Sequence, residues 1–424
     1  MSQNGAHETK KKTVRRRKTT QGRKRPLKTI LLIVLAVVLL VGIVGYAVFH
    51  HLYSQMNVVS DKKDAPSAAV GQEATATPFD DPEPTDTPEP TPRPLTEEEK
   101  QAQAEAELLA SLEKDAEEIM YNENVYNILL IGADGVKNTL ERSDAMILLS
   151  LNKATKEIWL TSFMRDTQVN IPGYGPGQHL NWATQYGGDE KGVQLLISTL
   201  ESEKNFAIHI DNWALVNFLD FGEVASLLGP VTVTVTPEEA VGMNALIRQV
   251  CQMRDKALGL TGEDRTVRSL FPEEGGTFTI TDGIQILSYC RERYTYVAGH
   301  YGDTGRSNKQ REVLMAMWEN VKKMNILQQY ALTEKVMSIV TTDLTEGKCF
   351  SLLLNAPSYL SYSVHQQQIP HVDAMTKGMF NGLSTYFPDL RVNRNILRGT
   401  IYGEELTAHD LYSSYTGINV VLPD

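Results

Sequence analysis

An uncharged run of 21 residues, Thr29 to Phe49, constrains the fold of this chain more than any other feature of its sequence. A helix needs about 20 apolar residues to cross the hydrocarbon core of a bilayer, so this run is long enough. It is longer than the apolar core of a signal peptide, and no small-residue cleavage site follows it. We therefore predict an uncleaved, single-pass transmembrane signal anchor at residues 29–49.

The 28 residues before this run form a strongly basic tail. They carry eleven Lys or Arg against the single acid Glu8, in a chain with a formal net charge of −11. Lys and Arg concentrate on the cytoplasmic side of membrane spans, so residues 1–28 are predicted to be cytoplasmic and the chain beyond the span extracytoplasmic. A nucleic-acid-binding arm is the alternative for such a tail. Because topology already explains the charge, we expect no nucleic-acid partner.

The segment that follows the predicted span is polar. Residues 50–95 are rich in Pro, Thr, Asp, Glu and Ala, above all from residue 57 onward, and this composition predicts an extended, disordered stalk. Residues 96–120 open with a capping box, Thr96 to Glu99, and continue as an Ala-, Glu- and Leu-rich stretch. We predict a connector helix there. Such a helix could pair as a coiled coil, and the sequence leaves the oligomeric state open.

The cysteine content argues against a disulfide framework. The chain has three cysteines, Cys251, Cys290 and Cys349, which is an odd number and a small one for an exported domain. We expect three buried, small apolar side chains. No pattern of closely spaced Cys or His predicts a zinc site.

Residues 121–424 contain no second linker and are predicted to form one α/β domain, with a mixed, partly antiparallel sheet covered by helices. Short apolar runs predict strands, and longer stretches with apolar residues at helical spacing predict helices. The strands are expected at 125–131, 145–151, 157–163, 206–210 and 231–235, and the helices at 181–201, 213–221 and 307–323, with a polar, helix-rich insertion at 237–278. The first three strands are expected to form an antiparallel meander.

Charged residues flank the three strands of this meander. Asp134 follows the first strand, Asp144 precedes the second, and Arg165-Asp166 follows the third. Antiparallel alternation places all of them at the same edge of the sheet. Arginine forks match phosphate oxygens, and aspartates supply the oxygen ligands that magnesium prefers. We predict a site for a magnesium-bound polyphosphate, to which Arg291-Glu292-Arg293 and Asp303 to Arg306 also contribute.

Each of these stretches also has a plain structural interpretation. Arg165-Asp166 could be a surface ion pair of little energetic value, and Asp303 to Arg306 an ordinary turn and helix cap. Arg291 and Arg293 diverge on a helix but share a face in an extended segment, so we expect the helix before them to end near Tyr289. The gathering of charge at one sheet edge favours a functional site.

Eight short motifs occur in a fixed order between residues 122 and 325. They are Asn127 to Asp134, Arg142 to Met146, Met164 to Thr167, Ile171 to Gly175, Leu180 to Ala183, Tyr186 to Gly188, Arg291 to Arg293 and Asp303 to Arg306. In order and spacing this set resembles the LytR-CpsA-Psr family of cell-envelope proteins, and so do the basic tail and single anchor. Residues 122–325 are the motif core, and residues 326–424 a C-terminal extension of the same domain.

The resemblance implies a bacterial membrane phosphotransferase that moves a glycopolymer, such as a teichoic acid or capsule, from an undecaprenyl pyrophosphate carrier to peptidoglycan. It implies that Asp134 and Asp144 hold Mg²⁺ and that an apolar pocket takes the lipid tail. The pyrophosphate would be bound by a set of basic residues: Arg142, Arg165, Arg291, Arg293, Arg306 and Lys309. Independently of the resemblance, transfer to a hydroxyl needs a proton acceptor, for which Asp166 or Asp303 is the candidate.

Several positions depart from the family pattern, among them Phe163, Ser226 and Pro230, and two of them bear on the charge of the site. Lys309 stands where a second arginine is usual, so it keeps the charge but loses the fork. His179 stands where a lysine is expected, so its charge depends on pH. Two alternative functions use the same site: hydrolysis of a polyprenyl pyrophosphate, or binding of a lipid phosphate without turnover, as a sensor or regulator of the envelope.

Overall fold

The computed structural model describes residues 45–59, 118–133, 142–262, 268–293 and 302–422. Asp134 and all or most of the predicted tail, membrane span, stalk and connector helix therefore lie outside the described residues. Residues 45–53 are helical. Within the described ranges, no helix is both long and apolar enough to cross a membrane.

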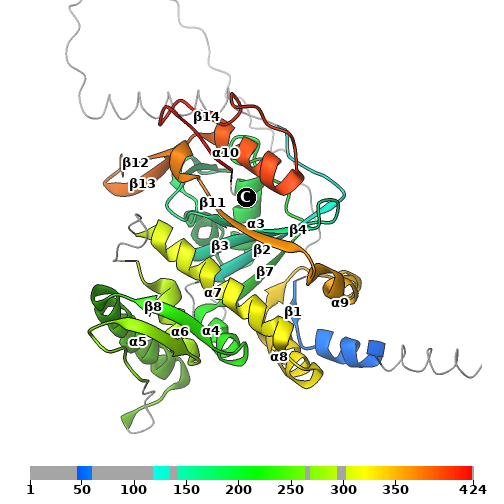
Figure 1. The fold of residues 1–424 in the computed structure, drawn as a ribbon, viewed down its shortest axis with the longest axis vertical. Helices are drawn as coiled ribbons and strands as arrows, with labels where there is room; N and C mark the ends of the chain where they lie inside the picture. The colour runs from blue at the N-terminus through cyan, green and yellow to red at the C-terminus, as the bar shows by residue number, and fades with distance from the viewer. Residues whose placement is uncertain (1–44, 60–117, 134–141, 263–267, 294–301, 423–424) are drawn as a thin grey trace, which may run out of the picture. The chain divides into compact units, whose positions relative to one another are not determined.

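A seven-stranded mixed sheet lies at the centre of the fold, in the order β1-β10-β7-β2-β3-β4-β11 (Figure 1). The strands are β1 (Asn57–Val58), β2 (Val125–Ala133), β3 (Ser143–Asn152), β4 (Glu157–Phe163), β7 (Asn212–Asn217), β10 (Thr341–Thr342) and β11 (Ser363–Ile369). β2, β3 and β4 pair antiparallel, whereas β7 pairs parallel with β2 and β11 parallel with β4. The predicted mixed sheet and its meander are confirmed.

Both faces of this sheet are covered by helices. Along β2, Leu129 and Ile131 pack into the core on one face, and Ile128 and Leu130 pack on the other. The first face is covered by α3 (Trp182–Glu201) and α10 (Leu390–Leu397), the second by α7 (Asp303–Lys323) and α9 (Glu346–Tyr359) (Figure 1). Burial on both faces explains why the strands appear in the sequence as nearly continuous apolar runs.

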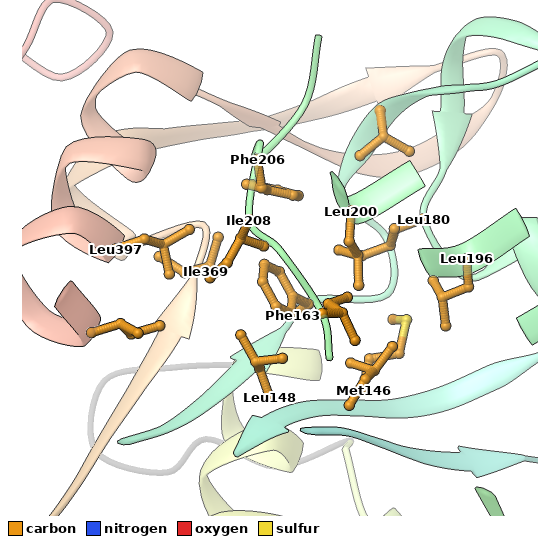
Figure 2. Packing of buried hydrophobic residues seen from close by; sticks show 14 of the residues in the cluster. Met146, Leu148, Phe163, Leu180, Leu196, Leu200, Phe206, Ile208, Ile369 and Leu397 are labelled. Carbon is orange, nitrogen blue, oxygen red and sulfur yellow. The ribbon is translucent and has the colours of Figure 1, made fainter. Parts of the chain in front are cut away.

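The larger core lies between the sheet and α3 and α10. Figure 2 shows Phe163 at its centre, with Leu148 of β3 and Ile208 pointing toward it and Leu196 and Leu397 closing its two sides. Leu148, Ile208, Leu196 and Leu397 are each 0% exposed. The larger core is therefore built from aliphatic and aromatic side chains that are closed to solvent.

A second core lies beside the sheet. It is built by α4 (Phe218–Leu227), α5 (Pro237–Leu258), α6 (Gly283–Arg291) and the hairpin of β8 (Val231–Val235) and β9 (Gly276–Ile280). Helix α7 joins the two parts, because Val313 and Met317 lie in the second core while Trp318 packs under the sheet. The N-terminus of α7 is thereby held at a fixed place.

The remaining elements are short. They are β5 (Gln168–Ile171), β6 (Gly175–His179), α8 (Ile326–Ile339), η2 (Val372–Ala374), β12 (Met375–Phe380), β13 (Leu383–Pro388), η3 (Arg398–Tyr402), β14 (Tyr412–Ser413) and β15 (Ile418–Asn419). The hairpin of β12 and β13 lies against β5 at the end of the sheet where β4 ends: Thr167 bridges to Tyr386, and the Tyr386 amide donates to the Asp166 carbonyl at 3.0 Å. The C-terminal extension thus belongs to the same domain.

The prediction for residues 206–221 is wrong in two respects. Residues 206–210 supply buried side chains and a single isolated bridge, from Ile208 to Met120, instead of a strand. The strand is β7, at Asn212–Asn217, and α4 begins only at Phe218. A short apolar run does not distinguish strand from helix by periodicity, and parallel pairing with β2 decides the outcome.

Three further boundaries need correction. Residues 50–59, predicted to open an extended stalk, instead contain helical residues 50–53 and the strand Asn57–Val58, which pairs with β10; the Val59 amide donates to the Thr342 carbonyl at 2.9 Å. The connector helix predicted to reach residue 120 does not include residues 118–120. Helix α7 begins at Asp303, four residues before the predicted start.

The three cysteines are free thiols, as predicted; Cys251 and Cys290 are buried, whereas Cys349 is only partly buried.

A cavity in the larger core should reduce the stability of the domain. Leu148→Ala should lower the free energy of unfolding by about 3–5 kcal/mol, because it removes a fully buried side chain from this core. Leu354→Ala, on α9 and 64% exposed, is the matched control and should cost under about 1 kcal/mol. Urea denaturation followed by circular dichroism measures both. If the two variants lost the same free energy of unfolding, the buried position of Leu148 would be contradicted.

Candidate functional site

Arg165 joins three aspartates that come from three different elements. Its Nη1 lies 2.8 Å from Oδ1 of Asp144 in β3, and its Nε lies 2.9 Å from Oδ2 of Asp303 at the start of α7. The same Nε lies 3.4 Å from Oδ1 of Asp166, the next residue in the turn after β4. The predicted convergence of charge at one sheet edge is confirmed for Asp144, Arg165 and Asp166.

Arg306 closes the cluster from the first turn of α7. Its Nη2 lies 3.1 Å from Oδ1 of Asp303 and donates to the Asp144 carbonyl at 3.2 Å. Both Asp303 and Arg306 are 5% exposed, so this is not a solvated helix cap. The first turn of α7, which the sequence left open between a cap and a site, lies inside the cluster.

The electrostatics of the cluster separate two neighbouring carboxyls. Burial, then the hydrogen bond and negative charge of Asp303, raise the pKa of Asp166 to about 7. Burial also raises the pKa of Asp303, but Arg306, Asp166 and Arg165 outweigh it, and the pKa lies below its ordinary value. The shared proton therefore resides on Asp166, which is close to its titration midpoint at neutral pH.

The two arginines remain charged. Burial lowers the pKa of Arg165, but the negative charges of Asp303, Asp166 and Asp144 raise it by more, so the pKa lies above its ordinary value. Burial is the main reason that the pKa of Arg306 is lowered, and the positive charges of Arg165 and Arg293 add to the effect. Arg293 is thus close enough to act on the cluster electrostatically.

The other predicted arginines lie around this cluster. Arg142 precedes β3, and its Nε donates to Gln185 of α3 at 3.1 Å. Arg291 is the last residue of α6, with its guanidinium 4.6 Å above the ring of Phe218. The helix ends two residues later than predicted, and the next residue, Glu292, is extended (ψ 133°). Arg291 is thus still helical, and the extended segment that was expected to carry both arginines begins only after it.

Lys309 is not part of the cluster. Its Nζ lies 2.9 Å from Glu239 of α5 and 2.7 Å from Glu292, and all three side chains are at most 3% exposed. Lys309 therefore lies outside the cluster predicted to bind phosphate, and its ammonium is enclosed by two buried carboxylates. It ties α5, the end of α6 and α7 together beside Arg291 and Arg293. The sequence placed Glu292 in the Arg291-Glu292-Arg293 motif, but it identified neither Glu292 nor Glu239 as a partner of Lys309, which lies far from them along the chain.

His179, which also departs from the family pattern, lies at the edge of the cluster. Its Nδ1 is 3.7 Å from Oδ1 of Asp166, and its Nε2 lies 2.9 Å from the Thr385 hydroxyl of β13. Burial and the charge of Arg165 lower its pKa, so the ring is neutral at neutral pH. Thr385 and its neighbour Tyr386 come from the C-terminal extension, which the motifs did not reach.

The acidic groups fit a magnesium ion held jointly with phosphate better than an all-protein cage. In the parts of the chain that the structure describes, no group of three or more His, Cys, Asp or Glu could hold a metal ion. Magnesium is commonly held by one or two carboxylates together with substrate phosphates. Asp144 offers one carboxylate, 13% exposed, and Ala133, the residue before Asp134, pairs with Ser143, the residue before Asp144.

Fold and site together define an α/β protein with a buried arginine–carboxylate cluster at one edge of its sheet. The chain belongs to the LytR_cpsA_psr family, whose family model matches residues 95–397.

The chain is similar in sequence to named proteins from several bacteria. The polyisoprenyl-teichoic acid–peptidoglycan teichoic acid transferase TagU of Oceanobacillus iheyensis is 31% identical over 246 residues, covering 57% of this chain and 66% of that relative. TagU of Enterococcus faecalis is 28% identical over 274 residues, covering 63% of this chain and 77% of the relative. The alignments therefore leave a quarter to a third of these relatives unmatched.

The crystal structure of protein gbs0355 from Streptococcus agalactiae has a similar fold. The TM-score is 0.51 at 20% identity, covering 67% of this chain and 90% of that one. At this level of identity the likeness concerns the fold alone.

Breaking the buried pairs of Lys309 should destabilise the domain. Lys309→Met leaves Glu239 and Glu292 buried without their cation, which should cost about 3–5 kcal/mol of unfolding free energy. Lys322→Met removes an exposed pair with Glu319 on the same helix and should cost under about 1 kcal/mol. Chemical denaturation of both variants gives the comparison. A small, equal effect would mean that the buried pairs contribute no more than a surface pair.

The raised pKa of Asp166 should make stability fall as pH rises. Between its ordinary value of 3.8 and about 7, the folded state binds more protons than the unfolded state, so unfolding becomes easier with rising pH across this window. Asp166→Asn removes this contribution and leaves the other titrating groups in place. The parent should lose stability relative to the variant between pH 4 and pH 8 in thermal denaturation. If the difference in stability between the parent and Asp166→Asn stayed constant with pH, the raised pKa of Asp166 would be contradicted.

Proposed function

We propose that this chain is a membrane-anchored phosphotransferase that moves a glycopolymer from a polyprenyl pyrophosphate carrier to peptidoglycan. The single observation that carries the proposal is the buried cluster in which Arg165 joins Asp144, Asp166 and Asp303. Membership of the LytR_cpsA_psr family and the transferase names of its relatives support the choice of donor and acceptor. Undecaprenyl pyrophosphate, implied by the family resemblance, is the expected carrier.

The arginines are suited to bind the pyrophosphate. Phosphoryl transfer requires positioning and charge neutralisation more than covalent help from the protein. Arg165 and Arg306 are held in place by carboxylates on two sides, so their donors need little reorganisation when phosphate oxygens arrive. Arg142, Arg291 and Arg293 lie on the segments next to this pair and would bind the remaining oxygens.

Asp166 is the best candidate for the general base. With a pKa of about 7 it can take a proton from an acceptor hydroxyl at neutral pH, whereas the lowered pKa of Asp303 makes that group a weak base. The hydroxyl oxygen bonds to the phosphorus that bears the glycan as its proton passes to Asp166. The bond from that phosphorus to the bridging oxygen breaks, and polyprenyl phosphate leaves with the electron pair. The product is a phosphodiester between the glycopolymer and peptidoglycan.

Magnesium is the proposed cofactor. Asp144 and Asp134 would hold Mg²⁺ together with the pyrophosphate, where it would neutralise charge on the phosphate oxygens. Asp144 would then exchange part of its interaction with Arg165 for the metal, freeing an arginine donor for phosphate.

The reaction is proposed to take place outside the cell membrane. The basic tail of residues 1–28 and the uncharged run of residues 29–49 support a single-pass anchor with the N-terminus in the cytoplasm. A lipid-linked donor is confined to the membrane and peptidoglycan lies outside it, so an anchored extracytoplasmic domain meets both substrates.

The test is product formation by the full-length protein in detergent. Incubation with a lipid pyrophosphate-linked glycan, Mg²⁺ and a peptidoglycan oligomer should give a phosphodiester-linked conjugate detectable by mass spectrometry. Arg165→Ala should reduce its rate by at least a hundredfold, because one side chain positions both phosphate and carboxylates. Arg248→Ala, at an exposed position on α5, is the matched control and should leave the rate unchanged.

The outcomes separate the alternatives. Glycan phosphate released without conjugate would indicate a hydrolase. Tight binding of the lipid with no turnover would indicate a sensor or regulator, and both results would overturn the proposed transfer.

A further inference from the structure

A polar cavity lies against the first turns of α7. It has a volume of about 240 Å³, which is smaller than the roughly 300–1,000 Å³ of pockets for drug-sized ligands. Its polar lining comes from α7, β11 and the segment just after β11: Thr304, Asn308, Arg311, Gln366, Gln367, Gln368 and His371. Among the described residues that line it there is no carboxylate.

Arg311 is the unusual member of this lining. It is 5% exposed, and its Nη2 donates to the side chain of Asn308, the only acceptor it has within the described chain. Among the described residues, no hydrogen-bond acceptor lies within reach of its buried Nε and Nη1. Burial lowers the pKa of Arg311 to about 10, and no charge of another described residue offsets this. A buried cation without a counter-ion is costly, so its retention calls for an explanation.

Gln367 also lines the cavity, but its side chain is held on the face of the sheet opposite α7. Its amide nitrogen donates to the hydroxyls of Thr161 and Thr400, at 3.0 and 2.9 Å, and Thr400 lies in η3, next to α10. The cavity is therefore lined by one cation, Arg311, and by neutral polar side chains such as Asn308 and Gln366.

We propose that this cavity binds a hydroxylated monoanion, namely a saccharide or polyol that carries a carboxylate or a phosphodiester. The oxyanion accepts from the guanidinium of Arg311, and ligand hydroxyls bond to neutral polar side chains of the lining such as Asn308 and Gln366. A single cation and an otherwise neutral lining favour one negative charge over two, because a second charge would be buried without compensation. Thr304 lines the cavity directly beside Asp303, so the ligand lies next to the proposed catalytic cluster.

The choice of a saccharide rests on the proposed function, whereas the monoanion site does not. The test is therefore a binding assay that requires no turnover. Isothermal titration calorimetry of the full-length protein in detergent would use N-acetylmuramic acid as the carboxylate, glycerophosphoglycerol as the phosphodiester, and N-acetylglucosamine as the neutral control. One of the two monoanions should bind at least tenfold more tightly than the neutral sugar, and which one binds identifies the source.

Variants locate the binding. Arg311→Met should weaken it at least tenfold, and Arg311→Lys, which keeps the charge but loses the fork, should give an intermediate affinity. Arg165→Ala should leave it intact, because that residue belongs to the cluster. Without ligand, Arg311→Met should unfold at the same temperature as the parent or a higher one, since an uncompensated buried charge has been removed.

Three outcomes would overturn the proposal. One is that neither monoanion binds more tightly than the neutral sugar. Another is that binding is lost in Arg165→Ala and kept in both Arg311 variants, which would place the anion in the cluster. The last is that Arg311→Met and Arg311→Lys both unfold earlier than the parent while binding is unchanged, which would make Arg311 a structural residue. A chain that binds the monoanion but forms no conjugate would retain this site and lose the proposed transfer.

Discussion

The position of one guanidinium, that of Arg165, determines how the candidate site is assembled. Its contacts at 2.8 and 2.9 Å tie the edge of the sheet to the start of α7, two segments separated by more than a hundred residues. Asp144 is held by the antiparallel ladder of β3 and Asp303 by a helix anchored in two cores. The site is therefore rigid because each of its charges stands on an element whose position is fixed by apolar packing.

The sequence predicted the part of this arrangement that follows from local pairing. Three apolar runs separated by short turns gave the meander, and antiparallel alternation then placed Asp144 and Arg165 at one edge, as observed. The motifs predicted that Asp303 to Arg306 contribute to the site, but strand pairing could not place them, because contact between Asp303 and the sheet depends on how a long helix crosses it. The sequence also assigned β7 to a helix, since six residues of mixed apolar character fit both periods.

Lys309 illustrates a different limit. Its place in the motif predicted a phosphate ligand, but a lysine and an arginine at the same position need not point to the same partner. Here the shorter ammonium is enclosed by Glu239 and Glu292, which come from 70 and 17 residues earlier in the chain. Neither spacing nor composition marks either acid as a partner of Lys309. Only the packing of α5 and α6 against α7 shows that they are.

The first turns of α7 contain three buried cations whose charges are compensated in different ways. Arg306 faces the carboxylates of Asp144 and Asp303, which also bind Arg165. Lys309 faces Glu239 and Glu292, and Arg311 faces no carboxylate among the described residues. Compensation by the protein itself suits a structural role, as at Lys309, because the charge is then satisfied in every state of the molecule. A cation that shares its carboxylates can exchange them for phosphate, and one with no carboxylate can accept only a group from outside. The way in which each cation of α7 is compensated therefore separates the residues that hold the domain together from those that bind ligands.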